Sequence, residues 1–345
     1  MSDLEINFER GEKPVIVAEI SGNHRNRVEN IELLMNKIKK AGVDFVKLQT
    51  YAPQRITLDS RISSFVVKSG IWAGKSLFEL YSQGETPNSW LPQLFRLAKE
   101  LHLTLFSSPF SPEDVQILEE FDCPIYKVAS LEITYTQLLE AIAMTGKPVV
   151  MSTGGATLEE IKYAIETLYS HGTKSLVLLK CSPTYPAQLR DLNLITIPFL
   201  REKFQVPVGF SDHTEGSIAA SIATALGSVM IEKHIKLDND DDSVDSKFAL
   251  KVSLLSDYVK QINAAWESMG QIKVSPTDSE VETLKYRRSI IAKEDMNRGD
   301  LIEFRKLAIV RPFIGMHPKD LDLVLGKKLK FDIKRGEGLT RDFFE

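Results

Sequence analysis

The chain has 345 residues, of which 43% are hydrophobic and 26% charged, and its formal net charge is -4. These proportions are those of an ordinary folded domain in water, so long disordered tracts and membrane-spanning segments are not expected. Positive charge is spread along the chain without a long Lys/Arg run, and we expect neither a nucleic-acid nor a membrane partner. A chain of this length exceeds what one hydrophobic core usually supports, which indicates a large domain with a smaller second one.

The cysteine content and the N-terminal residues bear on the cellular compartment. Cys123 and Cys181 are too few and too far apart in sequence for a disulfide framework or a thiolate zinc site, so both are expected to be buried thiols. Residues 1–8 have neither the basic start nor the apolar core of a secretory signal. We therefore expect a cytoplasmic protein.

Short β-branched runs alternate with amphipathic stretches of helical length through the first 270 residues. The expected strands are 15–20, 45–48, 103–107, 125–128, 149–152, 176–180, 208–211 and 230–235. The expected helices are 28–41, 90–101, 112–121, 136–144, 157–170, 196–204, 217–226 and 254–269. This repeated alternation predicts a (β/α)8 TIM barrel. A doubly wound open sheet is the alternative, but no Gly-rich dinucleotide fingerprint follows the first run.

Three segments depart from this pattern. Residues 51–89 are too long for an ordinary loop after a barrel strand and are expected to cover part of the active-site rim, with Trp72 as a packing anchor. The acidic run at Asp240, Asp241 and Asp242 lacks calcium-loop spacing and is expected to be a solvated loop tip. After Gly270 the pattern changes, which predicts domains at 1–270 and 285–345 joined by a linker over 271–284. The second domain is expected to be small and mostly β.

Polar side chains stand at the ends of most of the expected strands. In a barrel these ends meet at one rim, where catalytic groups are found. Lysine ammonium groups and serine hydroxyls gathered there are what a phosphate group needs, and a Ser-Thr-Gly-Gly turn at 152–155 adds backbone donors. The predicted phosphate cradle consists of Lys47, Lys127, Ser130, Ser152 and Ser211.

Two of the six histidines, His213 and His234, end successive apolar runs. If these runs are neighbouring parallel strands, both imidazoles project from the same rim and could hold a divalent metal. A hydrogen-bonded loop residue is the alternative role for His213. Glu19 ends the first run and is a candidate general acid or base, with Glu132 and Glu232 as competitors for that role.

Several of these segments together resemble the sialic acid synthase family, in sequence and in order. They are residues 18–24, 47–50, 106–110, 126–130, 209–214 and 231–234. Residues 287–299 and 311–315 resemble the antifreeze-like SAF domain of those synthases. Within the family, residues 72–81 and 85–87 are most similar to the pseudaminic acid synthase branch.

The resemblance implies condensation of phosphoenolpyruvate with an open-chain amino-sugar aldehyde, with C–O cleavage that releases phosphate and leaves a nine-carbon 2-keto acid. For the pseudaminic branch the sugar is 2,4-diacetamido-2,4,6-trideoxy-L-altrose. A sialic or legionaminic acid synthase, using N-acetylmannosamine or its diacetamido analogue, is the alternative within the family. A non-catalytic carbohydrate-binding protein is a more distant one.

The resemblance also implies roles for individual residues. Glu19 and Glu132 would be catalytic, the cradle residues and Lys293 would bind phosphoenolpyruvate, and His213 and His234 would bind Mn2+ or another divalent metal such as Mg2+ or Co2+. The sugar would be bound by Gln49, Tyr185, Asp245 and Arg311. Family members are domain-swapped homodimers in which the SAF domain covers the partner's barrel mouth, and Arg311 matches the arginine that reaches across. The chain departs from the family at Pro183, where the family has Asn, at residues 243–246, which replace Gly-Pro-Asp-Ser, and at Phe313, where the family has Gly after Arg-Pro.

Overall fold

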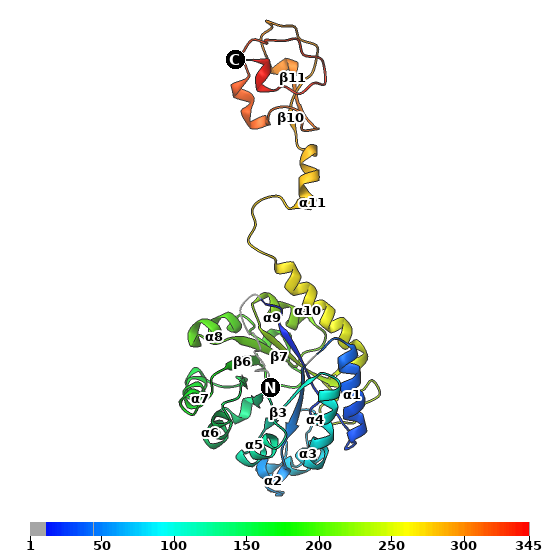
Figure 1. Cartoon of the computed structure of the whole chain (residues 1–345), viewed down its shortest axis with the longest axis vertical. Coiled ribbons are helices and arrows are strands. Elements are labelled where there is room, and N and C mark those ends of the chain that lie inside the picture. The colour runs from blue at the N-terminus through cyan, green and yellow to red at the C-terminus, as the bar shows by residue number, and fades with distance from the viewer. Residues whose placement is uncertain (1–11, 44, 345) are drawn as a thin grey trace. The chain divides into compact units, whose positions relative to one another are not determined.

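The computed structural model describes residues 12–43 and 45–344. The chain divides into two compact units, the first ending at Gly270 and the second beginning at Gln271 (Figure 1). Each unit has its own cluster of buried apolar side chains.

The first unit is a closed parallel barrel, which confirms the predicted fold class. Each strand is hydrogen-bonded to the next in parallel, and β1 pairs with β8 to close the sheet. The barrel strands are β1 Val15–Glu19, β2 Phe45–Thr50, β3 Thr104–Pro109, β4 Tyr126–Val128, β5 Val149–Ser152, β6 Leu176–Cys181, β7 Val208–Asp212 and β8 Met230–Lys236. A short strand, β9 Leu250–Lys251, pairs with the end of β8.

Helices surround these strands (Figure 1). They are α1 Val28–Lys40, α4 Leu91–Glu100, α5 Pro112–Glu119, α6 Thr136–Met144, α7 Leu158–Ser170, α8 Thr196–Phe204, α9 Ile218–Ala225 and α10 Leu255–Met269. In α1 the buried residues Ile31, Leu34, Met35 and Ile38 recur at the spacing of one helix face, which packs on the barrel. The expected starts at Ser111 and Thr157 are confirmed, since each side chain accepts a hydrogen bond from the third helical N–H.

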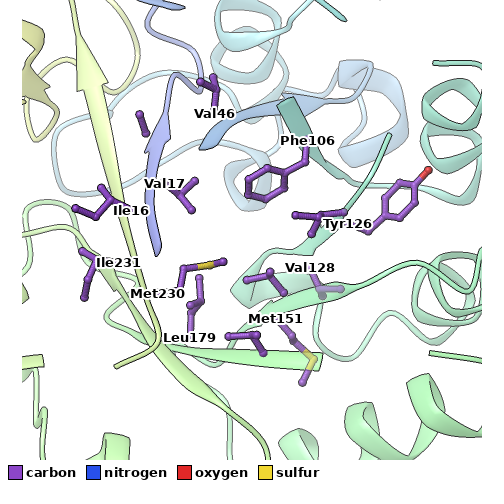
Figure 2. Close-up of a cluster of buried hydrophobic side chains, with 14 of the residues drawn as sticks. Ile16, Val17, Val46, Phe106, Tyr126, Val128, Met151, Leu179, Met230 and Ile231 are labelled. Atoms are coloured by element: carbon purple, nitrogen blue, oxygen red, sulfur yellow. The ribbon is translucent and has the colours of Figure 1, made fainter. Parts of the chain in front are cut away.

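Apolar side chains fill the lower part of the barrel interior. Figure 2 shows Val17, Phe106 and Met230 pointing toward one another in the space that the strands enclose, and each is fully buried. Gly209 on β7 leaves room for this layer, because a Cβ there would lie 2.5 Å from the Met230 carbonyl oxygen and 2.7 Å from a Leu179 methyl carbon. The packed layer supports the polar groups at the strand ends above it.

The long connection after β2 contains helices that the sequence did not predict. They are α2 Pro53–Ile56, the 3-10 turns Ser63–Phe65 and Asn88–Trp90, and α3 Leu77–Gly84. A capping box starts α3, with Ser76 accepting from Glu79 N at 3.2 Å and Glu79 accepting from Ser76 N at 3.1 Å. The segment therefore carries its own local structure.

The second unit contains a small antiparallel sheet. Part of the expected linker is helical, as α11 Asp278–Val281 and the 3-10 helix Glu282–Tyr286. The sheet pairs β10 Ser289–Ala292 with β11 Leu307–Val310, and isolated bridges join Ile291 to Gly338, Met296 to Ile333 and Leu301 to Lys328. Further 3-10 turns are Phe304–Lys306, Pro318–Leu323 and Arg341–Phe343. Ile290, Ile302, Val324, Ile333 and Leu339 form the fully buried centre of its core.

The acidic loop after β8 differs in one residue from the expectation. Asp240 is buried. Its carboxylate accepts hydrogen bonds from Arg25 Nε at 2.9 Å and from the Ser243 N–H and hydroxyl at 3.1 and 2.6 Å, which replace the water that the carboxylate loses. The prediction of a solvated side chain is therefore wrong for Asp240, although Asp241 and Asp242 are exposed. Among the described residues, no helix is both long and apolar enough to cross a membrane.

Candidate active site

A cavity of about 230 Å3 opens at the carboxyl ends of the barrel strands. All the site residues that the sequence predicted in the first unit line it. They are Glu19, Lys47, Gln49, Lys127, Ser130, Glu132, Ser152, Tyr185, Ser211, His213, His234 and Asp245. The barrel thus brings together side chains from every part of the first 245 residues, while their individual roles remain predictions.

Two lysines and two glutamates form a buried ionic cluster on the cavity floor. Lys47 Nζ lies 2.7 Å from Glu19 Oε2 and 3.1 Å from Glu232 Oε2, and Lys127 Nζ lies 3.5 Å from Glu232 Oε1. All four side chains are at most 3% exposed. Each carboxylate therefore has a cation beside it, which offsets the large desolvation cost of burying charge.

Glu232 is more central than the sequence analysis supposed. It was considered there only as a competing acid or base, yet it contacts both lysines and accepts a hydrogen bond from Ser211 Oγ at 2.8 Å. Burial by itself raises the pKa of Glu232, but Lys127, Lys47 and this hydrogen bond bring it far below its ordinary value. The sequence could have indicated this role, because Glu232 lies two residues before His234 and side chains two apart on a strand share one face.

Glu19 is held as a carboxylate. Its burial raises the pKa, while the charges of Lys47 and Lys127 lower it, and the net shift is downward. Gln49 Nε2 donates to Glu19 Oε1 at 2.9 Å, so both carboxylate oxygens have a partner. A fixed, ionised carboxylate in a cavity can accept a proton or orient a water molecule.

Glu132 lies in a different environment at the cavity rim. It belongs to the 3-10 turn Ser130–Glu132 and is half-buried. Burial raises the pKa of Glu132 to about 7, with Lys127 acting in the opposite direction. The two predicted catalytic carboxyls therefore differ in protonation at neutral pH, an arrangement that suits one base and one acid.

The serines of the predicted cradle are only partly free to bind a ligand. Ser211 donates to Glu232, and Ser130 Oγ accepts from the Gly154 N–H at 3.1 Å and lies 3.0 Å from Cys181 Sγ. The Gly154 backbone donor, expected to serve a phosphate, is thus directed at Ser130 here. Both cysteines are buried and free, as predicted, and Cys181 lines the cavity.

His213 and His234 lie together in the cavity wall. Their ring centroids are 5.2 Å apart, and each side chain is about 5% exposed. Burial lowers the pKa of His213, and burial lowers that of His234 to about 3, so both rings are neutral at neutral pH. His213 Nδ1 lies 2.8 Å from the Ser182 carbonyl oxygen, to which it can only donate, which leaves Nε2 as a lone-pair donor.

These two imidazoles fit the binding of a divalent cation. Neutral ring nitrogens are the form that ligates metals, and His234 Nδ1 is buried without a hydrogen-bond partner among the residues described. The described residues contain no group of three or more His, Cys, Asp or Glu side chains arranged to hold a metal. The remaining ligands of such a cation would therefore come from water or substrate.

Asp245 joins this group from the loop after β8. Its carboxylate lies 3.9 Å from His234 Nδ1 and accepts a hydrogen bond from Ser21 Oγ. Burial raises the pKa of Asp245 to about 6, although the Ser21 hydrogen bond lowers it. Asp245 therefore lies beside both the imidazole pair and the open cavity.

Aromatic side chains form a wall that the sequence analysis largely missed. Tyr51, Tyr81, Phe110 and Phe248 line the cavity together with Trp72 and Tyr185. Trp72 Nε1 donates to the Val244 carbonyl oxygen at 2.9 Å, which confirms its predicted role as an anchor of the long connection. The ring of its neighbour Tyr185 lies tilted against two others, with its centroid 4.5 Å from that of His213 and 4.6 Å from that of Phe248. No motif marked Phe248, because its position depends on how the loop after β8 folds back.

Two predicted site residues belong to the second unit. Lys293 directly follows β10, and its N–H donates to the Lys306 carbonyl oxygen at 2.8 Å. Arg311 follows β11 and lines a surface hollow within that unit, together with Arg287 and Arg288. Their predicted contacts with phosphoenolpyruvate and sugar remain predictions.

Comparisons with known proteins agree with this architecture. The NeuB family model matches residues 34–274, and the SAF domain model matches residues 287–345. The chain is 39% identical to the pseudaminic acid synthase of Campylobacter jejuni, over 98% of this chain and 99% of that protein. It is 31% identical to the N,N'-diacetyllegionaminic acid synthase of the same species, over 94% of this chain and 98% of that one.

Among solved structures, the N-acetylneuraminic acid synthetase of Leptospira borgpetersenii, in complex with citrate, superimposes with a TM-score of 0.70 at 26% identity. The match covers 80% of this chain and 92% of that one. The barrel, its ionic cluster and the C-terminal unit thus occur in a chain that resembles such synthases over nearly its whole length. The chain belongs to the NeuB family and carries a SAF domain at its C-terminal end.

Proposed function

We propose that this protein is a pseudaminic acid synthase, which condenses phosphoenolpyruvate with 2,4-diacetamido-2,4,6-trideoxy-L-altrose and water to give pseudaminic acid and phosphate. The relative that bears this name is more similar to the chain than the legionaminic acid synthase is, at 39% against 31% identity. The observation that carries the proposal is the single cavity that holds ionised Glu19, the Lys47 and Lys127 cations and the neutral His213 and His234 pair.

The cationic floor supports phosphoenolpyruvate binding. Lys47 and Lys127 supply positive charge, and the hydroxyls of Ser130 and Ser152 can donate to phosphate oxygens. Ser211 would do the same after its hydroxyl turns away from Glu232, to which it donates at 2.8 Å. Because Glu19 and Glu232 already neutralise the lysines, the incoming anion has to compete for their ammonium groups. Lys293 of the SAF domain would add a further cation, near the carboxylate.

Two carboxyl groups support the proton transfers. Carbon 3 of phosphoenolpyruvate bonds to the aldehyde carbon, and the aldehyde oxygen takes up a proton, for which Glu132 is the proposed donor. Water then adds to carbon 2 with Glu19 as the proposed base. The bond from carbon 2 to the phosphate oxygen breaks with its electrons leaving on phosphate, and the new hydroxyl on carbon 2 passes its proton to the departing phosphate as its oxygen becomes the keto oxygen. The resulting product is a 2-keto acid.

His213 and His234 would hold Mn2+ or a similar divalent ion. When bound, such an ion polarises the aldehyde oxygen and stabilises its developing negative charge. Gln49, Tyr185 and Asp245 line the same cavity and are proposed to orient the sugar. Arg311 would reach the sugar from the SAF domain of a partner subunit in a domain-swapped homodimer and help to exclude water.

We also propose that the enzyme works in the cytoplasm, where thiols stay reduced. Cys123 and Cys181 are both buried and free, which agrees with a reducing compartment.

The test is to incubate the purified protein with phosphoenolpyruvate and Mn2+ and, separately, with each of three sugars. These are the L-altro sugar, its D-manno counterpart and N-acetylmannosamine, and the readouts are phosphate release and product mass, with a chelator control. Turnover of the L-altro sugar alone, abolished by the chelator, would support the proposal. Preference for the D-manno sugar or N-acetylmannosamine would make the chain a legionaminic or sialic acid synthase. Absence of turnover with all three sugars would contradict an enzymatic role.

A further inference from the structure

A second buried polar cluster lies behind the proposed metal site, on the outer face of the barrel. It consists of Asp212 on β7, Lys233 on β8, Thr214 after β7 and Tyr258 on α10, all at most 3% exposed. Strand side chains alternate between faces, so Asp212 and Lys233 point away from the cavity that their sequence neighbours line. None of the catalytic steps proposed above uses this cluster.

The cluster is joined by hydrogen bonds around the Asp212 carboxylate. Asp212 and Lys233 are directly paired in the ladder of β7 and β8, and Lys233 Nζ lies 3.0 Å from Asp212 Oδ2. Tyr258 Oη donates to the same oxygen at 2.8 Å. The other oxygen, Oδ1, accepts from the Thr214 N–H at 2.9 Å and the Thr214 hydroxyl at 2.7 Å.

These contacts involve the residues directly next to the two histidines in sequence. His213 is the middle residue of the turn from Asp212 to Thr214, and Lys233 ties the far end of that turn by donating to the Thr214 carbonyl oxygen. Lys233 also directly precedes His234 on β8. One ammonium group therefore connects the backbone beside each imidazole, while Tyr258 secures the carboxylate to α10.

We propose that Asp212, Thr214, Lys233 and Tyr258 are positioning residues that hold His213 and His234 at the separation needed to bind a divalent cation. The inference rests on the metal role in the proposed function. It explains why the cluster lies at the last registered pair of β7 and β8, because a shift of one strand against the other at this step would displace His213 relative to His234.

The test is Mn2+ binding to the chelator-treated full-length protein, measured by titration calorimetry for two variants with matched controls. Thr214→Val is compared with Thr224→Val, since Thr224 is equally buried and donates to Ala220 O at 2.8 Å in α9. Tyr258→Phe is compared with Tyr126→Phe, which removes a buried hydroxyl that donates to Glu119 Oε1 at 2.6 Å. Thermal unfolding is recorded for all four.

Loss of a residue that orients metal ligands typically weakens metal binding by about 10-fold or more, so Thr214→Val and Tyr258→Phe should raise the Kd for Mn2+ by about that factor. The two controls should lose comparable thermal stability with the Kd unchanged. Asp212→Asn should raise the Kd for Mn2+ the most. If this variant does not fold because Lys233 loses its buried partner, Thr214→Val and Tyr258→Phe alone test the inference.

Unchanged Mn2+ affinity in Thr214→Val and Tyr258→Phe, with binding by the wild type, would overturn this inference and leave the proposed function intact. Equal weakening in the controls would also overturn it, since loss of stability would then explain the effect. If the wild type itself binds no Mn2+, the metal role in the proposed function fails and the positioning role fails with it.

Discussion

Glu19 and Lys47 are paired residues on β1 and β2, and their side chains form an ion pair of 2.7 Å inside the barrel mouth. Burial lowers the pKa of Lys47, but Glu19 and Glu232 raise it above its ordinary value, so the ammonium group stays charged. Parallel pairing directs both side chains to the same face, because partners in register share the orientation of the pleat. The ion pair thus follows from the register of the first two strands.

Replacing Glu19 with Gln should remove the proposed base while retaining its shape. Lys47 keeps Glu232 as a partner at 3.1 Å, so the fold should persist. A general base typically contributes about 10²- to 10⁴-fold, and kcat for phosphate release should fall by that range. Glu119→Gln, which alters a carboxylate paired with Lys147 away from the cavity, is the matched control and should retain activity. Full activity of Glu19→Gln would exclude a base role for Glu19.

Replacing His234 with Gln should abolish Mn2+ binding, because only one of the two proposed imidazole ligands remains. Calorimetric titration of the chelator-treated protein measures this directly, and activity restored by added Mn2+ in the wild type should not return in the variant. His171→Gln provides the control, since His171 is an exposed residue 3.6 Å from Glu140. Undiminished metal affinity in His234→Gln would place the cation elsewhere.

The pKa of Glu132, raised by burial to about 7, predicts a specific pH dependence. Because the folded state binds this proton more tightly than the unfolded state, the group contributes stability that is fully present below pH 4.5 and is lost as pH rises through about 7. In Glu132→Gln this contribution is absent. The free energy of unfolding of the wild type relative to the variant should therefore decrease between these pH values, as urea titrations at several pH values can determine.

Asp245, whose pKa is raised to about 6, contributes in the same direction in both proteins and cancels in the difference. A difference between wild type and Glu132→Gln that is independent of pH would contradict the raised pKa. The same variant should lose the limb of the pH profile of kcat/KM that the wild type shows near pH 7, if Glu132 is the proton donor.

Replacing Gly209 with Ala should destabilise the barrel. The added methyl group would lie 2.5 Å from the Met230 carbonyl oxygen and 2.7 Å from a Leu179 methyl carbon, and backbone cannot move aside cheaply. Overpacking of this kind costs about 1–3 kcal/mol, which urea unfolding resolves. A variant as stable as the wild type would show that β7 and β8 can separate at this point without loss.

Local sequence pattern determined the order and type of the barrel elements. The expected strand at Val149–Ser152 and the expected helices at Thr136–Met144 and Thr196–Phe204 have the observed bounds, because apolar periodicity acts within a few residues of chain. The position of polar residues at the ends of these strands predicted that Glu19, the lysines and the histidines line one cavity, but it did not predict the aromatic side chains beside them.

Tertiary structure decided what those side chains contact. Whether Glu232 pairs with Lys47 and Lys127, whether Phe248 packs beside Tyr185, and whether Asp240 is buried against Arg25 each depend on segments far apart in sequence. The pKa values of the site follow from the same contacts, since burial and neighbouring charge are properties of the folded barrel. Composition and periodicity are local properties of the sequence and carry no information on the distances between side chains of different strands. The ion pairs and pKa values of the cavity therefore depend on the closure of the strands into a barrel.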